Sequence, residues 1–250
     1  MNYIDATVSS GTDLQVGHFS VIEKNVKLGN NVLIGNNVTI WPGTIIGDGV
    51  QIGDGSVVGK QPKPSKTSTV KYDSAMLPLV VGANTTIGTN TVLYAGSTIG
   101  ENSLIADLAS VREKCVIGNF VVVGRGVSVE NGTQIGDYTK IQTGAYITGY
   151  MDIADHVFIA PMVTFTNDNF MGRTDERFKY IKGATIERGA RIGGGAVILP
   201  GIKIAEETFI AAGALVTKDT PSHKVIKGLP AKEYRDVPPK ELLRQQGGNK

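Results

Sequence analysis

An aliphatic residue recurs at every sixth position from Val81 to Ile159. The fourteen positions are Val81, Ile87, Leu93, Ile99, Ile105, Val111, Ile117, Val123, Val129, Ile135, Ile141, Ile147, Ile153 and Ile159. A small residue follows most of them four places later, as at Thr85, Ser97 and Ala109. Neither the period of an α-helix nor that of a β-strand matches a strict period of six. Such a fixed short repeat predicts a chain that stacks one structural unit on the next.

The same period appears on both sides of this stretch. The earlier positions are Val16, Ile22, Leu28, Ile34, Ile40, Ile46, Ile52 and Val58, and the later ones are Ile186, Ile192, Ile198, Ile204, Ile210 and Val216. Two segments, Gly59–Val80 and Thr164–Thr185, interrupt the repeat, and neither interval is a multiple of six. We therefore expect two loops extruded from a regular body.

A parallel β-helix accounts for a hexapeptide repeat. Each hexad forms a short strand and a turn, and three hexads close one triangular coil. The aliphatic residue points into the narrow interior, and the small residue fits near a corner where volume is scarce. The frequent glycine and asparagine suit the backbone conformations that corners require. The hexads predict roughly nine coils in one continuous domain.

Bulk composition narrows the classes of function. The formal net charge is only +2, which gives no reason to expect nucleic acid or an acidic membrane surface as a partner. The single cysteine excludes an intramolecular disulfide and fits a reducing compartment. No window approaches 18 consecutive apolar residues, and the segment MNYIDATVSSGTDL lacks the pattern of a signal peptide. We therefore expect a cytoplasmic protein without a membrane span.

The hexads resemble those of the left-handed β-helix acyltransferases, whose hallmark is [LIV]-G-x-x-[STAV]-x. VGHFS at Val16, IGNNV at Ile34 and IGTNT at Ile87 are examples. The resemblance implies a left-handed coil and a homotrimer. We expect the β-helix domain to span residues 1–236. The segment PPKELLRQQ predicts a short terminal helix with proline at its start, within residues 237–250.

The last coils resemble the end of the acetyl-CoA-dependent hexapeptide transferases. The segments that carry this resemblance are IGGGAVILPGI at Ile192, FIAAGALVTKD at Phe209 and VIKGLPAK at Val225. Small residues would let the pantetheine arm of acetyl-CoA lie against the backbone, and lysines would meet its phosphates. The predicted cofactor-binding residues are Ala160, Gly194, Gly195, Ala212, Gly213, Lys218, Lys227, Pro230 and Lys232.

The segment VFIAPMVTFTNDNF at Val157 favours an amine as the acceptor. Several hexapeptide acetyltransferases have a catalytic histidine after I-x-P-x-V, whereas this chain has the sequence TND. TND resembles the N-acetyltransferases of nucleotide-linked aminodeoxysugars, and the loop Gly59–Val80 falls where that family and the lipid A O-acyltransferases have one. A neutral amine is already a nucleophile, so it needs a weaker base than a hydroxyl does.

Carboxylates stand where these two families have histidines. When the chains are aligned on VREKCVIG at Val111, the aminosugar family's histidine falls at Asp107 and the lipid A family's at Glu113. We predict that Asp107 orients or deprotonates the acceptor amine. Glu130 lies 23 residues further on, so we expect it above Asp107 on the same face, where paired carboxylates would raise each other's pKa. For Glu113, between Arg112 and Lys114, a surface ion pair is the expectation.

The acceptor's nucleotide, dTDP or UDP, is expected near the first loop. Lysines would meet its pyrophosphate and a tyrosine would stack on its base. The predicted acceptor-binding residues are Lys71, Tyr72, Tyr94, Asn167 and Asp168. Cys115 is expected to be a buried structural thiol. His18, His156 and His223 are not favoured as catalysts, and no His/Cys spacing suggests a metal site.

These features together predict transfer of an acetyl group from acetyl-CoA to the amine of a nucleotide-linked aminodeoxysugar. Three alternatives stay open. The chain could be an O-acyltransferase of the lipid A type that uses acyl-carrier protein. It could acetylate another amine or hydroxyl, such as that of an amino acid or a simple sugar. It could be a β-helix scaffold without enzymatic activity.

Overall fold

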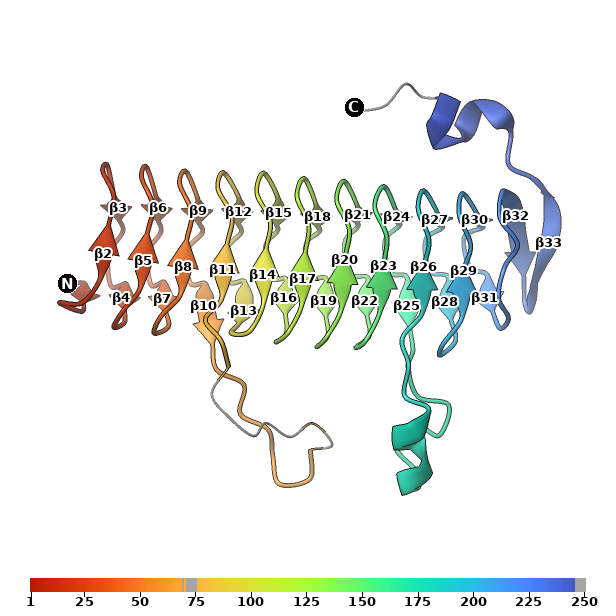
Figure 1. The fold of residues 1–250 in the computed structure, drawn as a ribbon, viewed down its shortest axis with the longest axis horizontal. Coiled ribbons are helices and arrows are strands. Elements are labelled where there is room, and N and C mark those ends of the chain that lie inside the picture. The colour runs from red at the N-terminus through yellow and green to blue at the C-terminus, as the bar shows by residue number, and fades with distance from the viewer. Residues whose placement is uncertain (69, 71–75, 246–250) are drawn as a thin grey trace.

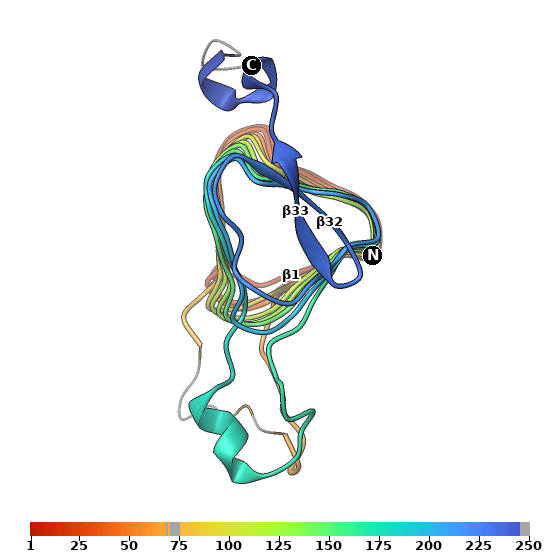
Figure 2. The ribbon, with the colours of Figure 1, turned by 90° about the vertical axis from the view of Figure 1, so that its right-hand side faces the viewer.

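The computed structural model describes residues 1–68, 70 and 76–245. The chain winds into a triangular prism whose three walls are parallel β-sheets (Figures 1 and 2). Partner residues in neighbouring coils are 18 positions apart, as for Arg112 and Glu130, which corresponds to three hexads per coil. The prediction of a parallel β-helix is therefore confirmed.

Sheet A contains 11 strands. They are β1 (Tyr3–Ile4), β4 (Val21–Ile22), β7 (Thr39–Ile40), β10 (Val57–Lys60), β13 (Val92–Tyr94), β16 (Ser110–Val111), β19 (Ser128–Val129), β22 (Tyr146–Ile147), β25 (Thr164–Phe165), β28 (Val197–Ile198) and β31 (Leu215–Val216).

Sheet B contains 10 strands. They are β2 (Ser9–Ser10), β5 (Lys27–Leu28), β8 (Ile45–Ile46), β11 (Val80–Val81), β14 (Thr98–Ile99), β17 (Val116–Ile117), β20 (Gln134–Ile135), β23 (Asp152–Ile153), β26 (Thr185–Ile186) and β29 (Lys203–Ile204). In Figure 1 these strands form the front wall and point upward while the coils advance to the right, which is the sense of a left-handed helix.

Sheet C contains 12 strands. They are β3 (Gln15–Val16), β6 (Leu33–Ile34), β9 (Gln51–Ile52), β12 (Thr86–Ile87), β15 (Leu104–Ile105), β18 (Val122–Val123), β21 (Lys140–Ile141), β24 (Phe158–Ile159), β27 (Arg191–Ile192), β30 (Phe209–Ile210), β32 (Lys224–Gly228) and β33 (Ala231–Asp236). The last two strands form an antiparallel hairpin that closes the end of the prism.

The interior is filled by the aliphatic residues of the repeat. All fourteen positions from Val81 to Ile159 are at most 3% exposed, and the small residues Thr85, Ser97 and Ala109 are buried with them. The second residue of most two-residue strands points inward and the first points outward, as the alternation of a strand requires. The buried hydroxyls are satisfied by neighbouring coils. For example, Thr85 Oγ1 donates to the carbonyl oxygen of Gly100 at 2.8 Å.

The coil number exceeds the prediction of roughly nine, because the sheets contain 11, 10 and 12 strands. The additional N-terminal coil was missed because Ser10 stands where the repeat has an aliphatic residue. Ile4 of this coil is 46% exposed, since no earlier coil covers it. At the other end, β32 pairs with β30 but lies out of phase with the period after Val216.

The three corners of the prism are named by the sheets they join. The A–B corner follows the strands of sheet A, the B–C corner those of sheet B, and the C–A corner those of sheet C. Both interruptions of the repeat are loops, as predicted. Loop 1 (61–79) follows β10 and loop 2 (166–184) follows β25, so both leave the A–B corner and project on the same side (Figure 2). Loop 2 contains the 3₁₀ helix η1 (Asp175–Lys179).

The predicted terminal helix takes the form of two short 3₁₀ helices, η2 (Pro239–Glu241) and η3 (Leu243–Gln245). Segment 237–244, called the C-terminal strap below, lies against the B–C corner. Val237 and Leu242 pack on Val225 and Phe209, and Leu243 N donates to Glu207 Oε1 at 2.6 Å. Within the described residues, no helix is long and apolar enough to cross a membrane.

Candidate active site

The A–B corner between the two loops brings together polar side chains from successive coils. Tyr94 ends β13, Arg112 follows β16, and Glu130 follows β19. Because these strands are neighbours in sheet A, the three side chains stand in one row along the corner. Loop 1 leaves the corner one coil before Tyr94, and loop 2 leaves it two coils after Glu130.

Arg112 joins two carboxylates at this corner. Its Nε and Nη2 donate to Glu113 Oε2 and Oε1 at 2.8 and 2.9 Å, and its Nη1 donates to Glu130 Oε2 at 3.4 Å. The side chain of Glu113 is 0% exposed and that of Glu130 is 25% exposed. The expected surface ion pair at Glu113 is thus a buried one. The sequence carries no clear signal of this burial, since Lys24 at the same position of an earlier coil is exposed.

Burial raises the pKa of Glu130 above the ordinary value of 4.5. The positive charge of Arg112 lowers this pKa and the negative charge of Glu113 raises it, and burial remains the largest effect. The pKa of Tyr146, on the next strand of sheet A, is raised by burial and then by the charge of Glu130. A carboxylate with a raised pKa is a better proton acceptor than an ordinary one.

Two cationic side chains lie over the ring of Tyr94. Lys60 Nζ lies 5.4 Å and Arg112 Cζ lies 5.3 Å from the centroid of its ring. A nucleotide base could stack on the Tyr94 ring only by displacing Lys60 or Arg112. A ligand at this place would therefore meet positive charge before it met the aromatic ring. The other two predicted residues of this region, Lys71 and Tyr72, lie outside the described residues.

The predicted acceptor residues of loop 2 have different positions. Asn167 reaches the corner, where its Nδ2 donates to the carbonyl oxygen of Gly149 at 3.4 Å. Asp168 makes its hydrogen bonds within loop 2. Its Oδ1 accepts from Phe170 N, and its Oδ2 accepts from Gly172 N and Arg177 Nε, at 2.8 to 2.9 Å. These hydrogen bonds, above all that from Gly172, lower the pKa of Asp168 and fix the entry to loop 2.

Asp107 and Glu130 are not on one face, so that expectation is wrong. Asp107 follows β15 and belongs to the C–A corner, whereas Glu130 follows β19 and belongs to the A–B corner. A separation of 23 residues exceeds one 18-residue coil by nearly a hexad, which moves the side chain to the next corner. Asp107 is exposed, and its Oδ1 accepts a hydrogen bond from Thr89 N at 2.8 Å, which ties two coils together.

Cys115 is buried beneath the Arg112 cluster. Its Sγ donates to the carbonyl oxygen of Glu130 at 3.2 Å, and burial raises the pKa of the thiol to about 12. Because the thiolate is the reactive form, this residue is a structural thiol.

Five of the predicted cofactor residues lie in one row at the C–A corner. Ala160 follows β24, Gly194 and Gly195 follow β27, and Ala212 and Gly213 follow β30. The coils are linked by hydrogen bonds from Gly195 N to Pro161 O at 3.0 Å and from Gly213 N to Gly194 O at 2.9 Å. A Cβ atom added at Gly195 or Gly213 would meet nothing within 4 Å, so the surface of this row is open.

The row also presents uncapped backbone donors. In earlier coils the corner N–H groups of His18, Asn36 and Thr89 donate to a side chain of the next coil. Gly194 and Ala212 occupy the same corner position, and within the described part of the chain no acceptor is recorded for their N–H groups. The small residues above them supply no side-chain oxygen that could accept from these two donors.

The hairpin β32–β33 continues the C–A corner. Lys227 and Lys232 face each other across the hairpin, with Pro230 in the turn between them. Lys227 Nζ lies 3.2 Å from the centroid of the Tyr234 ring. Lys218 does not belong to this group, because it follows β31 of sheet A and therefore lies at the A–B corner.

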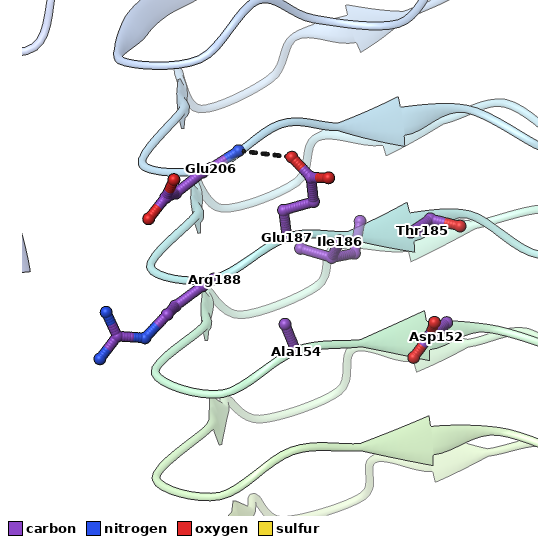
Figure 3. A pocket seen from close by; sticks show the side chains of 7 residues that line it. All are labelled: Asp152, Ala154, Thr185, Ile186, Glu187, Arg188 and Glu206. Carbon is purple, nitrogen blue, oxygen red and sulfur yellow. Dashed lines mark hydrogen bonds between the residues drawn. The ribbon is translucent and has the colours of Figure 1, made fainter.

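A separate hollow of about 430 Å³ lies where sheet B meets the B–C corner. Figure 3 shows Arg188 and Glu206 at one end of it and Asp152 and Thr185 at the other. Two of its charged residues are paired within the prism: Glu187 pairs with Lys203 and accepts a hydrogen bond from Glu206 N, and Arg188 pairs with Asp155. It contains none of the predicted site residues. Among the described residues, no three His, Cys, Asp or Glu side chains form a group that could hold a metal ion.

Comparisons with known proteins agree with this architecture. The family model "Bacterial transferase hexapeptide (six repeats)" matches residues 32–60, 114–149 and 183–218, and "Hexapeptide repeat of succinyl-transferase" matches residues 78–106. A solved UDP-N-acetylglucosamine acyltransferase from Bacteroides fragilis has a TM-score of 0.55 at 19% identity, over 99% of this chain and 77% of that chain. This likeness shows a shared fold.

Two curated relatives match shorter segments. A galactoside O-acetyltransferase from Lactococcus lactis is 32% identical over 101 residues, which are 39% of this chain and 49% of that protein. A 2,3,4,5-tetrahydropyridine-2,6-dicarboxylate N-acetyltransferase from Enterococcus faecalis is 42% identical over 52 residues, which are 21% of this chain and 22% of that protein. The matches thus span about half or less of the curated relatives. The chain belongs to the hexapeptide-repeat acyltransferase family.

Proposed function

We propose that the protein transfers an acetyl group from acetyl-CoA to the amino group of a nucleotide-linked aminodeoxysugar. The observation that carries this proposal is the cluster of Arg112, Glu113 and Glu130 at the corner between the two loops. One guanidinium serves two carboxylates there, and the half-buried Glu130 has a raised pKa. Such a carboxylate suits an ammonium group that must be bound and then deprotonated.

The reaction removes two protons from the acceptor nitrogen, one before the attack and one as the amide forms. Glu130 accepts a proton from the acceptor's ammonium group, and the neutral amine attacks the thioester carbonyl carbon. A C–N bond forms and the C–S bond breaks. The sulfur leaves with a proton as free CoA, and the second proton of the attacking nitrogen is lost as the amide forms. Asp107, at the corner of the cofactor row, is the second candidate for the proton acceptor.

The cofactor is proposed to lie along the C–A corner. The open surface at Gly195 and Gly213 accommodates a narrow arm, and the uncapped N–H groups of Gly194 and Ala212 would donate to its carbonyl oxygens or to the oxyanion. Lys227, with Lys232 and Pro230 of the hairpin, lies next to this row. A compact ammonium on a flexible stem is a common partner of phosphate groups.

The acceptor cluster and the cofactor row lie at different corners of one prism, with sheet A between them. The outward residue that begins each described strand of sheet A is uncharged: Tyr3, Val21, Thr39, Val57, Val92, Ser110, Ser128, Tyr146, Thr164, Val197 and Leu215. Lys60, at the other end of β10, lies beside the A–B corner over the Tyr94 ring. Sheet B has Lys27, Asp152 and Lys203 in this row, and sheet C has Lys140 and Arg191. Interface cores are depleted of charge, so we propose a homotrimer that packs through sheet A.

Such packing would complete the active site between subunits. In the proposed trimer, the cofactor row of one prism faces the loop-bearing corner of its neighbour. Each site would then take its acetyl donor from one chain and its acceptor cluster from another. A monomer would bind both substrates at separate corners without bringing them together.

Acetylation of a sugar hydroxyl is the second candidate function. The similarity to a galactoside O-acetyltransferase favours it. A hydroxyl is a weaker nucleophile than a neutral amine and requires its proton to be removed during attack. The Glu130 carboxylate would then act as a general base on the hydroxyl.

A matched substrate panel tests the proposal. The protein is incubated with acetyl-CoA and UDP- or dTDP-linked 3-amino and 4-amino sugars, together with the corresponding sugars that have a hydroxyl in place of the amine. Release of free thiol and the mass of the product are measured. We expect turnover with an aminosugar that exceeds turnover with its hydroxyl counterpart at least tenfold. Preference for the hydroxyl counterpart, or turnover with neither, would overturn the proposal.

A further inference from the structure

A groove on the side of the prism away from sheet A is independent of the proposed reaction. It lies between the strands of sheet C at the B–C corner and the C-terminal strap, and its volume is about 400 Å³. Volumes from about 300 to 1,000 Å³ are typical of small-molecule sites. Figure 2 shows the strap beside this corner and both loops on the opposite side of the prism.

One wall of the groove is a stack of aromatic rings. The rings of Phe120 and Tyr138 are 4.9 Å apart and 2° from parallel, and those of Tyr138 and His156 are 4.9 Å apart at 28°. The three residues occupy the same corner position in successive coils, with φ of 56°, 59° and 58°. In the next coil this position is Gly189, and the side chains of Leu243 and Glu207 take the place of a fourth ring: a Cβ atom added at Gly189 would meet Leu243 Cδ1 at 2.7 Å.

The floor of the groove contains an arginine whose hydrogen-bonding capacity is only partly used. Arg191 Nη1 pairs with Glu241 Oε2 at 3.1 Å, and the guanidinium lies 5.1 Å from the ring of Phe209. Its Nε and Nη2 are buried, and within the described part of the chain neither has a hydrogen-bond partner. Such donors cost stability when they are left unpaired. Nε and Nη2 form the edge of the guanidinium that matches a carboxylate or phosphate.

The other charged residues that line the groove are Lys140, Glu207 and Glu241. Lys140 lines the groove, and no ion pair is recorded for it among the residues that the structure describes. Glu207 also lines the groove, but its Oε1 accepts a hydrogen bond from Leu243 N of the strap. Glu241 is paired with Arg191. Both carboxylates thus have partners within the protein.

We propose that this groove binds a small planar aromatic molecule that carries a carboxylate or phosphate. The ring displaces the Leu243 side chain of the strap from its place beside Gly189 and stacks at the His156 end of the aromatic wall. The oxyanion accepts hydrogen bonds from Arg191 Nε and Nη2, with Lys140 as a second cation. Because Glu241 of the strap lies against Arg191, ligand binding also changes the solvent protection of the strap.

Calorimetric titration with four probes tests the site. The probes are 1-naphthyl phosphate, 1-naphthoate, the ring alone as 1-naphthol, and inorganic phosphate. We expect at least one of the two aromatic acids to bind with a Kd below about 1 mM and at least tenfold more tightly than 1-naphthol or inorganic phosphate does. The stronger of the two identifies the oxyanion. No binding by either acid, or equal binding by inorganic phosphate, would overturn the proposal.

Two pairs of variants locate the binding. Arg191→Lys keeps the charge but removes the two-donor edge, and we expect it to weaken the aromatic acid tenfold. His156→Asn removes the ring but suits the left-handed backbone, as Asn84 and Asn102 do in the same row, and it should weaken binding by a similar factor. The controls are Arg125→Lys and Tyr150→Asn (φ 63°), at the other two corners. Binding unchanged in Arg191→Lys and His156→Asn would refute the site.

Hydrogen exchange provides a second readout. We expect the ligand to alter the exchange of the Leu243 amide, which donates to Glu207 in the free protein. The Thr89 amide, which donates to Asp107 at the C–A corner, should not change. Altered exchange at Thr89 with none at Leu243 would move the binding site to another corner and contradict the proposal.

Discussion

The A–B and C–A corners of the prism are built from the same hexad but present opposite surfaces. At the A–B corner Arg112, Glu113 and Glu130 form a partly buried charge cluster, and two loops project beside it. At the C–A corner of the last coils glycine and alanine leave the backbone uncovered, and no side chain accepts from the N–H groups of Gly194 and Ala212 within the described residues. The inward residues are aliphatic in both regions. The comparison shows that the repeat fixes the interior while the corners are free to diverge.

The largest effect is expected where the two corners must meet across sheet A. Ser128→Lys places a charge in the uncharged outward row and, around a threefold axis, would bring three lysines together, at a cost of several kcal/mol. Light scattering coupled to size exclusion should show monomers, and acetyl transfer should fall more than tenfold. The control is Gln134→Lys on sheet B of the same coil. A fully assembled, active Ser128→Lys variant would contradict the shared site.

The next largest effect is expected at the A–B corner. Arg112→Met removes both guanidinium hydrogen bonds to the buried Glu113, and breaking a buried ion pair costs about 3 kcal/mol. The free energy of unfolding is measured in urea. Arg125→Met, at an exposed site, should change it by about 0.5 kcal/mol or less. Equal effects of the two substitutions would mean that the cluster contributes little to the fold.

A third comparison tests whether the proton acceptor is Glu130 at the A–B corner or Asp107 at the C–A corner. Glu130→Gln should lower kcat at least tenfold, about 1.4 kcal/mol of barrier, whereas Asp107→Asn retains an oxygen for Thr89 N and should have a smaller effect. Because burial raises the pKa of Glu130, the acid limb of kcat/KM should lie above pH 4.5 and should disappear in Glu130→Gln. The reverse ranking of the two variants would assign the role to Asp107.

The smallest effect is expected at the cofactor row. Gly195→Asn preserves the left-handed backbone (φ 65°) but adds bulk to the open surface, and KM for acetyl-CoA should rise about fivefold, close to 1 kcal/mol. Gly126→Asn is the matched control, because Gly126 has φ 64° in the same row at an earlier coil and is equally open. A similar KM in both variants would remove the cofactor from this row.

The walls of the prism could be predicted from the sequence because the residue type at an inward position depends only on its place within the repeat. Every coil needs an aliphatic residue there, and the two loops stood out as interruptions. It was harder to predict from the sequence which residues share a corner. The separation of Asp107 and Glu130 is close to one coil and predicts a shared face, but the five residues beyond one coil place them at different corners.

The burial of Glu113 also escaped prediction. A charge flanked by Arg112 and Lys114 reads as a surface ion pair, and the hexad pattern alone does not reveal that this carboxylate is 0% exposed. The contacts of the C-terminal strap could not be predicted from the sequence either. Its contacts join Glu241 to Arg191 and Leu243 to Glu207, over separations of 50 and 36 residues, and no repeat records such pairs.

Cys115 gives the protein a reporter of local opening at its proposed catalytic corner. It is the single cysteine of the chain, it is 0% exposed, and its thiol hydrogen-bonds the carbonyl oxygen of Glu130. An alkylating reagent can reach the sulfur only when the coils at this corner separate, so the rate of labelling measures how often they do. An acceptor held at Glu130 should slow that rate, and a ligand on the opposite side of the prism should leave it unchanged.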